Sequence, residues 1–249
     1  MTSAEKQPLE LCFLGTGNAF ASQRYWSSFL VNGLYLFDCA PTALVHLKRT
    51  GRPPEDIRAV FISHFHGDHF FGLPFLLLEY AVTTPRSDDL FIVGPAQIQE
   101  KLELITELGF PGLLEVSSGY RRRYVEVGDG MSGEAGGIPF QALRVDHASS
   151  LECFGYRVEV EGRTVAYSGD VRMGDVAFRL AEGADVFVVE CSCWEPDCGP
   201  HLNPQDIRAL RKAIPPSTIF VLTHLDAGQG DIGDLDGIIL AEDFRVYRL

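Results

Sequence analysis

Three histidines and an aspartate fall within six residues, and this segment restricts the fold more than any other feature of the chain. It follows an apolar run that predicts a buried strand, and together they read Ala59-Val60-Phe61-Ile62-Ser63-His64-Phe65-His66-Gly67-Asp68-His69. Side chains two residues apart in an extended chain point the same way, so His64 and His66 can reach one metal ion. The glycine lets the backbone turn, which brings Asp68 and His69 to the start of a helix, where they can face a second metal. Paired metals a few ångströms apart are an arrangement used for hydrolysis. We call residues 64–69 the histidine segment.

Further metal-binding residue types stand at the ends of later apolar runs. His147, Asp170 and His224 each follow or end a run that predicts a strand. Strand ends that share one edge of a sheet form the usual place for a ligand site in proteins of mixed helix and strand. We therefore expect these three residues to complete a site with the histidine segment.

The predicted strands and helices follow the same order in each half of the chain. Asn32-Gly33 and Glu161-Gly162 are two-residue turn signals between strand-like runs, and Asn203 followed by Pro204 is typical of a helix start. Strands are predicted at 9–14, 28–31, 34–38, 59–63, 89–93, 155–160, 163–168, 185–189, 218–223, 238–240 and 244–249, with several between 114 and 145, and helices at 41–50, 72–83, 96–108 and 204–214. Because hairpin-joined strands come first and helices follow, two packed sheets with helices outside are favoured over a doubly wound parallel sheet.

Composition places the chain among globular proteins and limits its partners. Its 249 residues are 46% apolar and 22% charged, and we expect one domain over residues 1–249. No apolar run approaches the roughly 18 residues of a membrane span, and the N-terminus lacks a signal peptide's apolar core, so a cytoplasmic protein is predicted. The net charge of −13 argues against sequence-independent binding of nucleic acid through its phosphates. The basic run Arg121-Arg122-Arg123 is expected to be solvated beside a strand at 124–127.

The series of motifs resembles the metallo-β-lactamase superfamily over nearly the whole chain, and within it the RNase Z-like branch. The similar stretches are FLGTGNAF, LFDCAPTALVHL, SHFHGDHFFGLP, the segment from His147 to Tyr156, and LTHLDA. This resemblance implies a four-layer αββα sandwich, in which two mixed sheets are flanked by helices. It also implies two metals: His64, His66 and His147 on one, Asp68, His69 and His224 on the other, and Asp170 bridging both. Donors of nitrogen and oxygen suit Zn²⁺, with Mn²⁺ and Fe²⁺ left open. Since relatives often dimerise, a homodimer is implied in the same way.

The resemblance implies a metal-dependent hydrolase with a defined division of labour. A hydroxide bridging the metals would be the nucleophile, with Asp68 orienting it, and the positive site suits an anionic substrate. RNase Z-like proteins place a non-ligand histidine after a strand that bears an acidic residue. Here these residues are His201, the candidate general acid, and Glu190, which would orient it. Their surroundings, Glu190-Cys191-Ser192 and His201-Leu202-Asn203, look more like cyclic phosphodiesterases associated with phosphonate breakdown. We therefore expect a phosphodiesterase acting on a small or cyclic phosphodiester.

Alternatives remain open at this point. A carboxyl-ester, lactone or thioester hydrolase on the same scaffold would not need His201. RNase Z-like processing of RNA 3′ ends is a further alternative, but RNase Z carries a tRNA-gripping arm between the equivalents of His147 and Asp170, and the short interval 148–169 leaves no room for one. Together with the net charge, this disfavours folded nucleic acid as a partner. Cys191, Cys193 and Cys198 form a loosely spaced candidate for an additional metal site.

Overall fold

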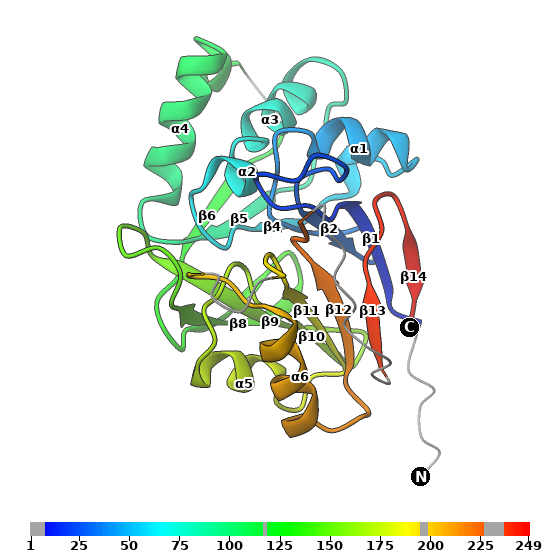
Figure 1. Cartoon of the computed structure of the whole chain (residues 1–249). Helices are drawn as coiled ribbons and strands as arrows, with labels where there is room; N and C mark the ends of the chain where they lie inside the picture. Colours follow the sequence, from blue (N-terminus) through cyan, green and yellow to red (C-terminus); the bar gives the residue numbers. More distant parts are fainter. Residues whose placement is uncertain (1–7, 117–118, 195–198, 227–236) are drawn as a thin grey trace.

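The computed structural model describes residues 8–116, 119–194, 199–226 and 237–249, and in this part of the chain two seven-stranded sheets pack face to face (Figure 1). The first sheet has the order β14-β1-β2-β3-β4-β5-β6. Its strands are β1 (Glu10–Gly15), β2 (Ser28–Val31), β3 (Tyr35–Phe37), β4 (Ala59–Phe61), β5 (Leu90–Gly94), β6 (Arg122–Glu126) and β14 (Val246–Arg248). The second sheet has the order β13-β12-β11-β10-β9-β8-β7. Its strands are β7 (Ser132–Ala135), β8 (Ile138–Val145), β9 (Cys153–Val160), β10 (Arg163–Tyr167), β11 (Val186–Glu190), β12 (Ile219–Thr223) and β13 (Ile238–Leu240).

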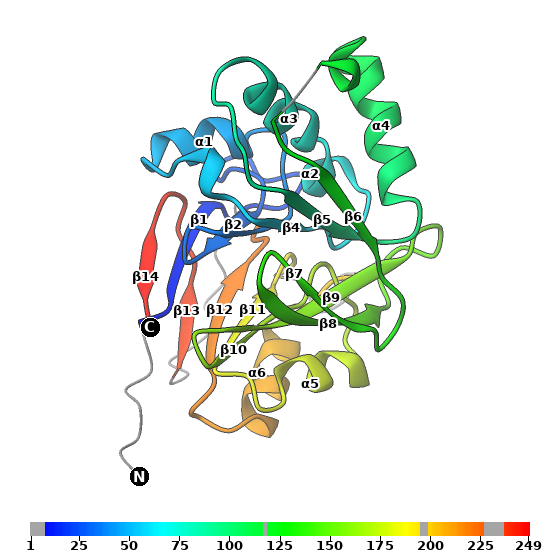
Figure 2. The ribbon, with the colours of Figure 1, turned by 180° about the vertical axis from the view of Figure 1, so that it is seen from behind.

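Helices cover the outer face of each sheet, so the order of layers is helix, sheet, sheet, helix, as Figures 1 and 2 show from opposite sides. The first sheet carries α1 (Ala43–Arg49), α2 (Gly67–Phe70), α3 (Leu73–Val82) and α4 (Ile98–Gly109), and the second carries α5 (Asp175–Ala181) and α6 (Pro204–Ala213). Two short 3₁₀ turns, η1 (Pro54–Asp56) and η2 (Leu113–Glu115), complete the set. The predicted sandwich of two mixed sheets between helices is therefore confirmed. Among the helices described here, none is both long and apolar enough to cross a membrane.

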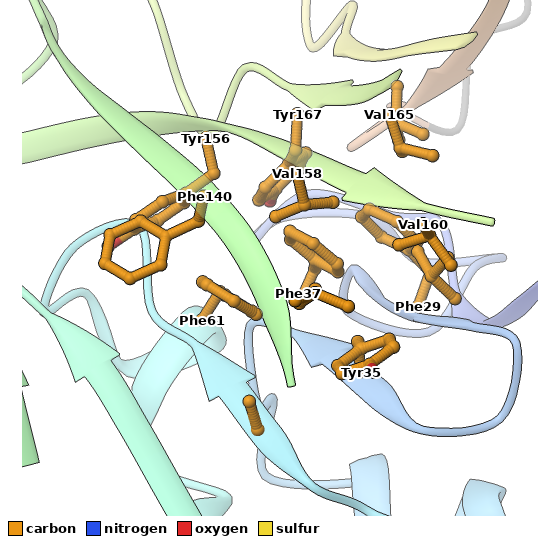
Figure 3. Packing of buried hydrophobic residues seen from close by; sticks show 14 of the residues in the cluster. Phe29, Tyr35, Phe37, Phe61, Phe140, Tyr156, Val158, Val160, Val165 and Tyr167 are labelled. Carbon is orange, nitrogen blue, oxygen red and sulfur yellow. The ribbon is translucent and has the colours of Figure 1, made fainter. Parts of the chain in front are cut away.

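Alternation along the buried strands divides the interior into three hydrophobic layers. In β4, Phe61 points into the layer between the sheets, whereas Val60 points into the layer beneath the helices of the first sheet. The layer between the sheets is rich in aromatic rings: Phe37 stacks on Phe29 at 4.9 Å and on Phe61 at 5.0 Å (Figure 3). Tyr156 and Tyr167 meet these rings from the opposite sheet. Burying each such side chain contributes about 1.5–3 kcal/mol to the stability of the fold. The contacts between these rings fix how the two sheets face each other.

The direction of the strands gathers their ends at one edge of the second sheet. β9 is antiparallel to both β8 and β10, so β8 and β10 run the same way. β10, β11 and β12 are mutually parallel neighbours. The carboxyl ends of β8, β10, β11 and β12 therefore lie on one side of the sheet. We call the residues there, His147, Asp170, Glu190 and His224, the second-sheet edge.

Local signals account for most of the elements, and two departures have physical reasons. Asn32-Gly33 and Glu161-Gly162 form turns, as predicted. Both residues of each turn have positive φ, between 49° and 70°. Asn203 caps α6, with its side chain accepting from the amides of Gln205 and Asp206. Helix α5 was not predicted; it has seven residues, as α1 has, but no proline marks its start as Pro41 does for α1. Arg122 and Arg123 lie within β6 rather than before it, and Arg123 pairs with Asp89 at 2.8 Å.

Candidate metal centre

The histidine segment leaves the first sheet at the end of β4. His66 keeps an extended backbone (φ −65°, ψ 148°) and stands at the start of α2. His64 Nε2 and His66 Nδ1 lie 2.8 Å apart, so the two rings do face one position, as their spacing predicted. Asp68 and His69 fall in α2, with Asp68 Oδ2 at 3.4 Å from His69 Nε2. One extended tripeptide and one helical turn thus arrange all four side chains.

The second-sheet edge meets this segment across the interface between the two sheets. His147 Nε2 comes within 3.4 Å of His66 Nδ1, and His224 Nε2 within 3.1 Å of His69 Nε2. Asp170 lies between the two groups, and its Oδ2 is 3.5 Å from His69 Nε2 and 3.6 Å from His147 Nε2. The structure therefore brings together all seven residues for which the sequence predicted a metal-binding role. They form two groups, and within each group the donor atoms lie within 4.8 Å of one another. One group is His64, His66, His147 and Asp170, and the other is Asp68, His69 and His224.

The chemistry of these donors fits divalent metal ions. Asp170 is 3% exposed, and its Oδ1 lies 3.4 Å from His224 Nδ1 but accepts no hydrogen bond from the described residues, which is costly for a buried carboxylate oxygen. Two nitrogens that each bind one tetrahedral metal at about 2.1 Å lie about 3.4 Å apart. The facing ring nitrogens lie 3.4 Å apart for His66 and His147 and 3.1 Å apart for His69 and His224, whereas His64 and His66 are closer, at 2.8 Å. Cations between these atoms would satisfy both observations.

Burial and charge set the protonation of the candidate ligands. Burial, aided by the neighbouring His69, lowers the pKa of His64, so its ring is neutral and can bind a metal. Burial would raise the pKa of Asp68 and Asp170, but His69 and His224 outweigh it and keep both residues as carboxylates. For His69, burial is outweighed by Asp170 and Asp38, which raise its pKa. A metal ion that binds His69 would release the proton that these carboxylates hold on its ring.

Asp38 supports the site from behind and was missed in the sequence. It follows β3, is fully buried, and adopts a positive φ of 52°. Its Oδ2 accepts from Ser63 Oγ at 2.8 Å and Tyr167 OH at 2.6 Å, and lies 2.7 Å from His69 Nδ1. A carboxylate behind a histidine ligand fixes the ring and raises its basicity. An acidic residue directly after a fully apolar strand was the available signal.

Glu190 and His201 form a pair at the other side of the site. Glu190 ends β11 and is fully buried, with its Oε1 accepting from the amide of Val171 at 2.7 Å. His201 Nδ1 lies 3.0 and 3.1 Å from the two carboxylate oxygens. Burial alone would lower the pKa of His201, but the hydrogen bond and charge of Glu190 raise it to about 9. His201 is therefore a cation at neutral pH, which makes it a proton donor.

His201 also lies near enough to Asp170 and His224 to be counted with them as a potential metal group. Its Nδ1 is 4.0 Å from Asp170 Oδ2, and the shorter contacts are those to Glu190. Because a protonated imidazole has no lone pair to offer a metal, the Glu190 contact favours proton transfer over metal binding.

A cavity of about 510 Å³ opens over this constellation. It is lined by the candidate ligands His66, Asp68, His147, Asp170 and His224, together with His201. The loop after β1 supplies Asn18, Ala19 and Phe20. This volume is in the range of pockets that bind small molecules. Trp194 packs against the outer core of the second sheet.

The cysteines do not form a further metal group among the described residues. Cys191 is buried in the core between the second sheet and its helices. Cys193 is disulfide-bonded, which the sequence did not suggest, and a disulfide sulfur is not a thiolate ligand. Cys198 lies outside the described residues.

Comparison with known proteins agrees with this geometry. Residues 34–225 match the family model described as the beta-lactamase superfamily domain. Ribonuclease BN of Escherichia coli is 36% identical over 159 residues, which cover 61% of this chain but only 50% of that protein, so the chain matches about half its length. Ribonuclease Z of Methanosarcina acetivorans is 26% identical over 97% of this chain and 98% of its own. The crystal structure of the short form of human tRNase Z superposes with a TM-score of 0.76 at 25% identity, over 96% of this chain and 98% of that one. The chain belongs to the metallo-β-lactamase superfamily.

Proposed function

We propose that this protein is a hydrolase of small phosphodiesters that works with two divalent metal ions. His64, His66 and His147 would hold one ion, Asp68, His69 and His224 the other, and Asp170 would lie between them. Zn²⁺ suits imidazole and carboxylate donors in this number. When bound, such ions lower the pKa of water so that it can attack at neutral pH, and they neutralise charge on the phosphate.

The Glu190–His201 pair is the observation that favours phosphodiesters as substrates. An alkoxide that leaves phosphorus needs a proton, and His201 is protonated at neutral pH and lines the cavity. Glu190 holds Nδ1 of the ring, so Nε2 is the nitrogen left to donate toward a ligand. Asp68, which lines the same cavity, would accept a hydrogen bond from the attacking water and orient it. Thioester hydrolysis, whose thiolate leaves readily, has less need of such a donor.

The size of the substrate follows from the chain between His147 and Asp170. The β9–β10 hairpin occupies this interval, and its turn at 161–162 is two residues long. No protruding segment is present there to hold a large folded substrate. The names of the relatives favour RNA 3′-end processing as a second candidate, because both curated relatives are ribonucleases. That candidate predicts binding that weakens steeply with salt.

Two substrates of different leaving group test the proposal. The metal-loaded protein is assayed with bis(p-nitrophenyl) phosphate, whose leaving group needs no proton, and with a dialkyl-type cyclic phosphodiester, whose leaving group does. We expect His66→Ala to abolish both reactions and to lower the bound metal measured by mass spectrometry. We expect His201→Ala to slow only the alkyl ester, by about a hundredfold or more.

The same assays can overturn the proposal. Absence of phosphodiester turnover in protein shown to contain metal would reject phosphodiesters, and turnover of lactones or thioesters instead would identify the alternative. An equal loss on both substrates in His201→Ala would reject His201 as the proton donor. Cleavage restricted to RNA with a 3′ extension would favour the second candidate.

A further inference from the structure

Phe20 exposes its ring beside the proposed reaction site. Its side chain is 90% exposed and belongs to none of the three hydrophobic layers, yet it lines the same cavity as His201 and Asp68. The cavity, at about 510 Å³, is much larger than a phosphate group alone. The substrate has room to extend from the phosphate toward this ring.

The loop that carries Phe20 is fixed to both halves of the site. The amide of Asn18 donates to Leu225 O at 3.1 Å, next to His224, and Asn18 Nδ2 donates to Ser192 O at 3.2 Å. Asn18 Oδ1 in turn accepts from the amide of Phe20 at 3.0 Å. These bonds set the position of the Phe20 backbone relative to the second-sheet edge. An aromatic ring presented on an ordered loop binds with little loss of conformational freedom.

The charge of the cavity limits which charged groups a substrate bound beside Phe20 can carry. Of the described residues that line the cavity, none is lysine or arginine, whereas Asp68, Asp170 and Asp226 are acidic. A second phosphate on the substrate would therefore find no lysine or arginine among the described residues that line the cavity.

We infer that Phe20 is a specificity-determining residue that stacks against a flat, uncharged ring on a substrate whose only negative charge is its phosphodiester. This inference rests on the proposed function and names the substrate class of the same site. Stacked aromatic pairs gain free energy beyond that of buried area, so the ring would be preferred over an aliphatic group of equal size.

A series of cyclic phosphodiesters tests this selection directly. Propane-1,2-diol cyclic phosphate is the parent, and its 3-phenyl, 3-cyclohexyl and 3-phosphate derivatives keep the same ester. We expect kcat/KM, followed by phosphorus NMR, to be about tenfold higher for the phenyl derivative than for the parent, with the cyclohexyl derivative between them. The phosphate derivative should be at least about tenfold poorer than the parent, because its added charge meets Asp226 and no lysine or arginine among the described lining residues. Calorimetric affinities of the same compounds for a His201→Ala protein give the ranking without turnover.

The Phe20→Ala variant isolates the contribution of the ring. Its phenyl-to-parent ratio should fall from about ten to about one, while Phe20→Trp should keep the preference. Phe75→Ala is the matched control, because Phe75 is a half-exposed phenylalanine on α3 that does not line the cavity, and its ratio should stay near ten. A phenyl preference that persists in Phe20→Ala, or a phosphate derivative that is preferred, would overturn the inference. Absence of turnover of every ester would instead reject the proposed function, and the calorimetric ranking would still decide the role of Phe20.

Discussion

The histidine segment and the second-sheet edge supply the same kinds of side chain to one site by different means. The histidine segment places four of them within six consecutive residues, so one extended stretch and the first turn of α2 fix their geometry. The second-sheet edge draws its residues from four strands, between residues 147 and 224, and their alignment depends on strand order and direction. One half of the site is therefore local, whereas the other exists only when the second sheet is assembled.

Asp170→Asn is expected to have the largest effect, because Asp170 joins the two regions. Its Oδ2 lies within 4 Å of His64, His69 and His147. Loss of the carboxylate charge should remove bound metal and slow phosphodiester hydrolysis more than about a thousandfold. Metal content by mass spectrometry and the initial rate measure this. Asp129→Asn, at an exposed turn, is the control, and full metal content in Asp170→Asn would show that the two regions bind metal independently.

Glu190→Gln should affect the second-sheet edge alone. Without the carboxylate, the pKa of His201 falls from about 9 toward or below the ordinary histidine value of 6.5, because burial then dominates. A general acid must be protonated, so activity on alkyl esters is lost as pH rises through the pKa of His201. We expect the basic limb of the pH–rate profile to move to lower pH and the rate at pH 8 to fall by about 30- to 100-fold. The rate on bis(p-nitrophenyl) phosphate should show no such shift, and an unmoved limb would contradict the assignment.

Asp38→Asn should affect the histidine segment in a different way. Asp38 touches His69 Nδ1 but no part of the Glu190–His201 pair, so the substitution should weaken metal binding by about 10- to 100-fold and leave the dependence on leaving group unchanged. Titration of the metal-free protein with Zn²⁺ in a competing chelator measures the affinity. Asp89→Asn, a partly exposed aspartate at β5, serves as the control. Unaltered affinity would mean that Asp38 serves only the packing of the two sheets through Tyr167.

Arg172→Ala should give the smallest effect and test how the loops of the second-sheet edge are held. Arg172 follows Asp170, and its amide and Nε donate to Asp146 at 2.7 and 3.1 Å, while its Nη1 donates to Gly199 O at 2.8 Å. It thus connects the loops of His147, Asp170 and His201. Since these contacts are exposed, we expect only a three- to fivefold loss on alkyl esters. Arg123→Ala removes a similarly exposed ion pair far from the site, and an equal loss there would deny Arg172 a specific role.

The sequence predicted the parts of the molecule that local rules govern. Turns such as Asn32-Gly33 and the cap at Asn203 appear where expected, because backbone conformation and the first helical turn depend on neighbouring residues. Asp38 was missed because its partners come from two distant segments, Ser63 and His69 from the stretch after β4 and Tyr167 from β10. The cavity wall at Phe20 was missed for the same reason.

By itself the sequence determined the histidine segment, the strands and most helices, since periodicity, spacing and turn chemistry act over a few residues. It also named His147, Asp170, Glu190, His201 and His224 as candidates through their positions after strands and the family resemblance. Only the tertiary structure decided that these residues meet, with Asp170 between the two groups and Glu190 behind His201. The physical reason is that strand order, strand direction and the packing of aromatic rings between the sheets are set by contacts between distant parts of the chain.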